Sequence, residues 1–156
     1  MRCLKESQWN LLFIMQRHGV KTRLLDWSES FAVALFFTCD KWALTNCNSA
    51  IWLLDSLGLN ELTLDERMFY SPDKDKKYTD FLNSKSPFYD NSLALYPLRN
   101  NNRIVSQHGM FTIPGKAAKP LEEEHVGQLI DLNILKKIEI TPTVKKDELL
   151  YFFLFF

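Results

Sequence analysis

The apolar run at 31–37 constrains the fold of this chain more than any other feature of the sequence. It reads Phe-Ala-Val-Ala-Leu-Phe-Phe and contains no polar side chain. Ser28 is placed to cap a helix, and Glu29 would lie in its first turn, so the pattern predicts a helix over 29–42. A helix that is apolar on nearly every side is normally buried. A buried strand is the alternative for the same run.

The remaining segments change between helical and strand-like patterns. Apolar residues at helical spacing predict a first helix over 9–17, which Gly19 would cap. The apolar segment 49–55 is predicted to be an interior strand of one small mixed sheet. The segment 103–113, whose strand-like composition Gly109 interrupts, is predicted to be another strand of that sheet. The predicted helices would pack against that sheet.

The second half of the chain extends this mixed pattern. A mixed charge run and two prolines predict a surface insertion over 58–91, with one short helix in it. A loosely helical stretch over 121–134 and a strand over 137–140 follow. Helices and strands come in no regular βαβ order, which favours the α+β class. We expect a single domain over 1–156, with its motif core at 9–55 and 93–150.

Composition narrows the classes of function. The chain has 156 residues, of which 46% are hydrophobic, so one packed domain is expected. Lys plus Arg and Asp plus Glu both number 19, and this balance does not indicate a nucleic-acid partner. Three cysteines without a CxxC pair favour free thiols in a reducing cytoplasm. No signal peptide is visible and every apolar run is too short to cross a bilayer, so no membrane association is expected.

The segment 16–27 concentrates polar and aromatic side chains between two apolar helices. Binding groups often collect in loops that a rigid scaffold holds, and arginine offers a planar fork for carboxylate or phosphate. The structural alternative is that Arg23 and Asp26 pair with each other; we expect both to be buried and hydrogen-bonded. The candidate functional residues in this segment are His18, Thr22, Arg23, Asp26 and Trp27.

A second polar cluster lies at 102–112 and includes Arg103 and Gln107. Gly109 would let the backbone come close to a ligand, and Gln107 is expected to share one cleft with the 16–26 loop. The alternative is a polar strand face at a sheet edge. The three histidines are too scattered to indicate a metal site, and no glycine-rich phosphate loop is present. The glutamates at 122–124 are expected to form a solvated helix start.

Two strings together resemble a known family. QRHGVKTRLLDWSESFAVALFF resembles the central motif of the FRG domain family, and NNRIVSQHGMFTI resembles its second signature. The resemblance covers about 9–150. The aromatic-Arg-Gly motif that gives the family its name is absent upstream of Trp9. A last helix is predicted from Val144 onward; with the strand at 137–140 it resembles the end of the family's domain, but it stops early. A domain shortened at both ends is therefore expected.

The resemblance implies a function as well as a fold. The family's motif order is similar to that of ADP-ribosyltransferases, which bind NAD, and its members are bacterial or phage-associated proteins suspected of phage defence or toxin activity. This implies catalytic roles for Gln107, Arg23 and His18 and cofactor contacts from Thr22, Asp26, Trp27 and Arg103, with no metal. Without the early arginine motif, NAD-dependent activity is expected to be weak or lost.

Two other functions stay open. The same polar cluster could serve a non-catalytic module that recognises a nucleotide or a protein, and a hydrolase or nuclease is less favoured. The apolar segment 149–156 is expected to dock on a groove of the core or to mediate self-association, because large exposed apolar patches are rare on soluble monomers.

Overall fold

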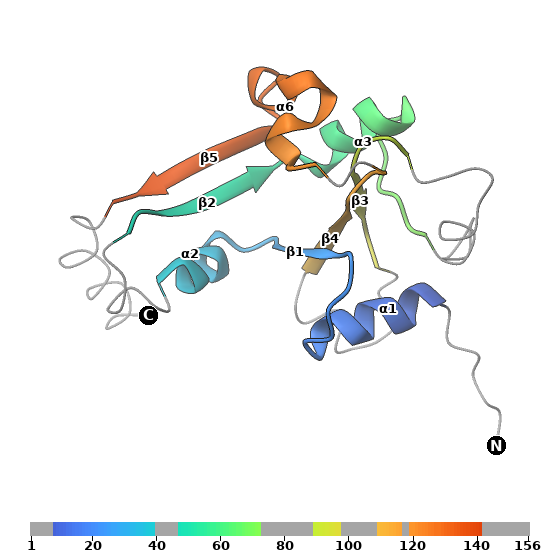
Figure 1. The fold of residues 1–156 in the computed structure, drawn as a ribbon, viewed down its shortest axis with the longest axis horizontal. Helices are drawn as coiled ribbons and strands as arrows, with labels where there is room; N and C mark the ends of the chain where they lie inside the picture. Colours follow the sequence, from blue (N-terminus) through green and yellow to red (C-terminus); the bar gives the residue numbers. More distant parts are fainter. Residues whose placement is uncertain (1–7, 40–46, 73–88, 98–108, 117–118, 142–156) are drawn as a thin grey trace.

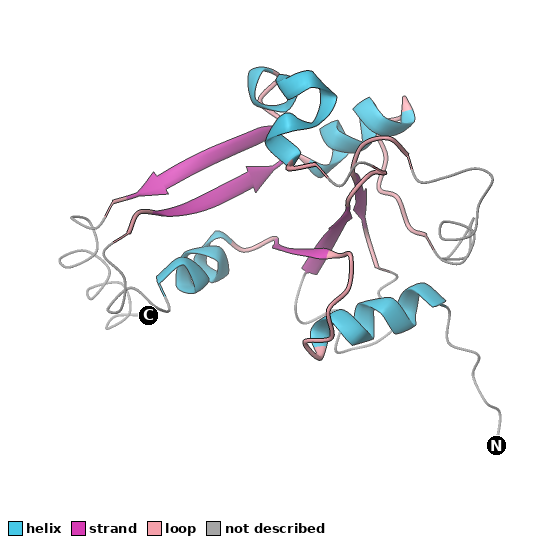
Figure 2. Ribbon diagram, viewed as in Figure 1, coloured by secondary structure: helices cyan, strands magenta, loops and turns pink. Residues whose placement is uncertain are grey.

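A computed structural model of the chain describes residues 8–39, 47–72, 89–97, 109–116 and 119–141 (Figure 1). Both helices and strands are present, so the chain has the α+β architecture that the sequence predicts (Figure 2). Within these ranges, no helix has the length and apolar character needed to span a membrane. In chain order the elements are α1 (Gln8–Arg17), β1 (Leu25–Ser28), α2 (Phe31–Cys39), β2 (Ser49–Leu54), α3 (Ser56–Leu64), β3 (Leu93–Leu95), β4 (Gly109–Ile113), the 3₁₀ helix η2 (Leu121–Gly127), α6 (Gln128–Asp131) and β5 (Leu135–Ile140).

The described strands form two antiparallel sheets. One has the order β1-β4-β3 and the other pairs β2 with β5. The prediction that 49–55 and 103–113 share one mixed sheet is wrong, because β2 pairs along its whole length with β5 while β4 lies between β1 and β3. β1 itself was missed, since its four residues lie within what the sequence suggested was a loop.

The three-stranded sheet carries a core on each face. Phe111 and Ile113 of β4 point toward α1, where the rings of Phe13 and Phe111 stack with centroids 4.9 Å apart. Met110 belongs to the second core, which includes Leu59 of α3 and residues of α6 and β5. The alternation of side chains along β4 therefore separates the two cores.

Helix α2 departs from the expectation of a buried helix. It begins at Phe31 rather than at Glu29, because Ser30 takes the capping position and its Oγ accepts from the Val33 N–H at 3.4 Å. Ser28 instead bonds locally to Ser30. The exposed fraction of Phe37 is 71%, so the prediction of burial is wrong for much of this helix. Within the described residues α2 packs on β1 and β2 by one side only.

Helix α3 corrects the prediction of a surface insertion over 58–91 for the start of that range, because α3 belongs to the core. Leu59 and Asn60 are completely buried. The Asn60 side chain accepts from the Ala94 N–H at 2.8 Å and donates to the carbonyls of Ala94 and Met68, both at 3.0 Å. It thereby completes the hydrogen bonding of β3 on the side away from β4. The short helix expected in the insertion falls on 78–82, outside the described residues.

Candidate functional site

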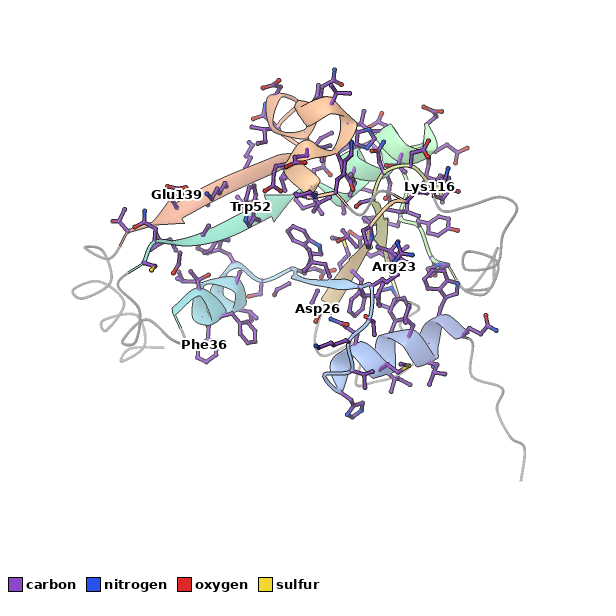
Figure 3. The ribbon with its side chains drawn as sticks, viewed as in Figure 1. Arg23, Asp26, Phe36, Trp52, Lys116 and Glu139 are labelled. Atoms are coloured by element: carbon purple, nitrogen blue, oxygen red, sulfur yellow. The ribbon has the colours of Figure 1, made fainter. Side chains whose placement is uncertain are left out.

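A cavity of about 340 Å³ lies beside β1 and is lined by residues from both sheets. Arg23 comes from the segment before β1, and Trp52 comes from β2 (Figure 3). Leucines and prolines complete the wall. The polar and aromatic side chains that line the cavity are Arg23, Trp27, Trp52, Ser92, Thr112, Lys119 and Glu122.

The alternation of β1 decides which motif residues reach the cavity. Leu25 and Trp27 point to the cavity side of the sheet, where Trp27 Nε1 donates to Thr112 Oγ1 at 3.0 Å. Asp26 pairs in register with Phe111 and shares the side of the sheet that faces α1. Of the predicted site residues, Arg23 and Trp27 therefore line the cavity and Asp26 does not.

The Gln16 side chain forms hydrogen bonds with two other residues of the motif, Thr22 and Asp26. Its Oε1 accepts from Thr22 Oγ1, and its Nε2 donates to the Asp26 carboxylate at 3.2 Å. Thr22 Oγ1 also accepts from the Leu24 N–H at 3.1 Å. These bonds fasten the loop before β1 to the last turn of α1. Thr22 and Asp26 thus position the segment that carries Arg23, while Arg23 and Asp26 are themselves exposed, so the prediction that both are buried is wrong.

His18 lies at the end of α1 and is exposed. Gly19 has a φ of 75° and caps the helix as predicted, with bonds from the Gly19 N–H to the Gln16 carbonyl and from the Val20 N–H to the Met15 carbonyl, both at 3.0 Å. This geometry explains the glycine and leaves His18 outside the cavity lining. Arg103, Gln107 and the cleft expected around Gln107 lie outside the described residues.

One wall of the cavity is held by a buried carboxylate. Glu124 has an exposed fraction of 3%, and its two carboxylate oxygens accept from the Ser92 N–H and Oγ, both at 2.7 Å. Thr63 Oγ1 donates to the Ser92 carbonyl at 2.9 Å. Ser92 and the segment 119–122 both line the cavity, so the bonds of Glu124 tie that segment to the residue that precedes β3. The expectation that Glu124 is solvated is wrong, because η2 turns it inward to these partners.

The residues after Glu124 adopt an unusual backbone. His125 and Val126 have φ values of 47° and 60°, a region that β-branched residues rarely occupy. The His125 ring lies 3.3 Å from Thr63 Oγ1 and 3.4 Å from Asn91 Nδ2. Burial lowers the pKa of His125 below its ordinary value, and the charge of Glu124 only partly offsets that effect. The burial of the ring and its uncharged neighbours thus favour a neutral imidazole between α3 and the segment before β3.

The charges and rings of the cavity indicate what it can bind. Arg23 and Lys119 supply two cations, and Glu122 supplies one carboxylate. Trp27 and Trp52 supply aromatic surface, and Lys137 Nζ lies 5.7 Å from the Trp52 ring centroid. An anionic ligand with a flat ring would find complementary groups here. The described residues contain no group of His, Cys, Asp and Glu that could hold a metal ion.

Among the polar and aromatic residues that line the cavity, sequence reasoning missed five. Thr112 lies inside the second motif, and its place opposite β1 follows once the antiparallel register is known. Trp52 stands in a strand that was predicted, but which face it occupies depends on pairing with β5. Ser92 and Lys119 lie in irregular segments and Glu122 lies in the first turn of η2, and none of these three positions carries a local sequence signal of a site.

Comparison with known families supports the motif assignment for the first part of the chain. Residues 1–46 match the model of the FRG domain. The matched region includes α1, β1 and α2, and with them Arg23 and Trp27 of the cavity. No curated protein and no solved structure matches the chain.

Proposed function

We propose that this FRG-domain protein binds a nucleotide, NAD or a part of it, in the cavity beside β1. The observation that carries the proposal is the meeting of Arg23 and Trp27, from the segment that matches the FRG domain, with Lys119 and Trp52 from later in the chain. Recognition of phosphate calls for cations and N–H donors, and recognition of a base calls for an aromatic surface. The cavity offers both.

The chemistry of the lining fits NAD in part. Arg23 and Lys119 would hold phosphate oxygens, and the carboxylate of Glu122 could accept from ribose hydroxyls. The volume is near the lower end of the range of about 300–1,000 Å³ typical of ligand pockets. A single nucleotide therefore suits this volume better than a whole dinucleotide.

Binding is better supported than catalysis. ADP-ribosyl transfer would need groups beside the bond that breaks, and His18 does not line the cavity. Gln107, to which the family resemblance gives the principal role, is outside the described residues. We therefore propose a binding module, with weak NAD-dependent transfer and a part in phage defence as the further roles that the resemblance implies.

Tryptophan fluorescence provides the test, because Trp27 and Trp52 both line the cavity. NAD, ADP-ribose, AMP and nicotinamide would each be titrated into the protein. We expect AMP or ADP-ribose to quench the emission in a saturable way and nicotinamide alone to bind least. Arg23→Ala should weaken binding by about tenfold to a hundredfold, since a hydrogen bond to a charged group contributes about 1.5–3 kcal/mol.

Lys21→Ala is the matched control. Lys21 is an exposed cation two positions before Arg23 and does not line the cavity. If Lys21→Ala lost as much affinity for the ligand as Arg23→Ala, the loss would reflect only the general attraction of anions to positive charge and not a contact in the cavity. Absence of saturable binding for all four ligands would refute the nucleotide proposal. A separate assay of NAD consumption by chromatography would then bear on catalysis alone.

A further inference from the structure

Helix α2 presents an apolar stripe to solvent. Val33, Phe36 and Phe37 follow one another at i, i+3 and i+4, and their exposed fractions are 43%, 46% and 71%. The Phe36 and Phe37 rings contact each other edge to face, with centroids 5.7 Å apart. Phe31, at the start of the helix, is also 53% exposed. Such a stripe is the face that a helix normally packs against another element.

The composition of α2 makes this face unsuited to water. The helix contains no charged residue, and Thr38, its one hydroxyl side chain, donates to the Ala34 carbonyl within the helix at 2.8 Å. The exposed face therefore has no polar group of its own to solvate. Contiguous apolar surface of this kind marks a place where another segment or molecule binds.

We propose that residues 149–156 of the same chain cover the exposed face of α2. This segment reads Leu-Leu-Tyr-Phe-Phe-Leu-Phe-Phe and contains no charge. It lies outside the described residues. An uncharged face of phenylalanine and valine requires an occupant without charges, because burying an unpaired charge is costly.

The path of the chain leads toward α2. Ile140 at the end of β5 pairs with Ser49 at the start of β2, and α2 packs on β2 (Figure 1). Residue 149 follows Thr141 by eight positions, a reach of roughly 25 Å when extended. A nine-residue helix is about 13 Å long, so the segment can reach the whole stripe.

Attachment to the same chain favours this occupant over a second copy. A segment on a short tether acts at an effective concentration of the order of millimolar, above the working concentration of most proteins. An intramolecular contact therefore forms first unless geometry forbids it. The alternative is that a second molecule of this chain binds to the exposed face of α2, and the experiment must distinguish that contact from the intramolecular one.

Disulfide trapping tests the contact directly. In a chain with Cys3, Cys39 and Cys47 replaced by Ser, Phe37→Cys and Phe153→Cys would be combined and oxidised at low protein concentration. We expect a disulfide within the monomer. The control pairs Phe153→Cys with Val126→Cys, whose parent side chain is 95% exposed on η2 at the other end of β5. That pair should form far less of the intramolecular bond.

A second measurement uses no cysteines. Deleting 149–156 should increase the binding of a hydrophobic dye, and replacing Phe36 and Phe37 by Ser in the shortened chain should remove that increase. Circular dichroism would establish that the shortened chains stay folded. Disulfides formed only between molecules, trapping no better than in the control, or dye binding unchanged by the deletion would each overturn the proposal.

Discussion

Gln16 on α1 donates a hydrogen bond to the Asp26 carboxylate on β1 across 3.2 Å, although the two residues are ten positions apart. The same side chain accepts from Thr22, so one amide on α1 holds both the loop before β1 and β1 itself. Arg23 lies within that loop and reaches the cavity. The polar residues of this motif thus divide into those that hold the loop and those that face a ligand.

This relationship predicts a modest cost for Asp26→Ala. Asp26 is exposed, so its bond to Gln16 competes with water, and the free energy of unfolding should fall by about 1 kcal/mol rather than the 3–5 kcal/mol of a broken buried pair. Urea unfolding would measure the change. Asp26→Asn, which keeps an acceptor, should lose less. A loss above about 3 kcal/mol for Asp26→Ala would contradict the exposed geometry.

Glu124→Ala should reduce both stability and ligand binding. The substitution leaves the buried Ser92 N–H without its acceptor, at a cost of about 1–3 kcal/mol. It also frees the segment that carries Lys119 and Glu122 on the cavity rim, so any ligand of the cavity should bind less tightly. Thermal unfolding and fluorescence titration would measure the two effects.

The neighbouring Glu123 supplies the control. It has the same side chain and is exposed, so Glu123→Ala should change the free energy of unfolding by less than about 0.5 kcal/mol. If the two alanine variants behaved alike, the contact between Glu124 and Ser92 would not hold the cavity wall.

Asn60→Ala should be among the most destabilising substitutions in the described chain. It removes the partner of the Ala94 N–H and of two carbonyls, and Asn60 is completely buried. Unsatisfied buried groups cost about 1–3 kcal/mol each, so a total near 3 kcal/mol is expected after local relaxation. Asn48→Ala, at an exposed position before β2, should change little. Similar urea midpoints for the two variants would refute this role of Asn60.

The elements that the sequence predicted well have strong local signals. The first helix and its glycine cap depend on spacing and on one residue that tolerates positive φ, and both are confirmed at α1 and Gly19. Strand β2 is likewise confirmed over Ser49–Leu54. These features need no knowledge of distant partners.

The errors arise where distant partners decide the outcome. Asn60 reads as a polar residue of an insertion, yet pairing with Ala94, 34 positions later, buries it. Glu124 reads as solvated until Ser92 is placed beside it. For α2, composition predicted burial, but the described part of the chain covers only one of its sides. The candidate cavity was predicted only as far as Arg23 and Trp27, because its other groups come from separate segments.

The neutral His125 predicts a specific loss of stability in acid. Burial lowers its pKa in the folded chain, so between that value and the unfolded pKa of about 6.5 the unfolded state binds more protons. The stability that the neutral His125 ring contributes is therefore present above about pH 6.5 and is lost as pH falls through the folded pKa. Glu124 attracts the charged ring and so reduces this loss of stability, while Thr63 and Asn91 are neutral partners.

The variant His125→Asn tests this prediction. Asparagine tolerates the positive φ, and the substitution should remove the part of the acid destabilisation that is due to His125. Urea unfolding of both proteins at pH 7.5 and 5.5 isolates it from carboxylates common to both: the parent should lose more stability than the variant, and parallel losses would contradict the prediction.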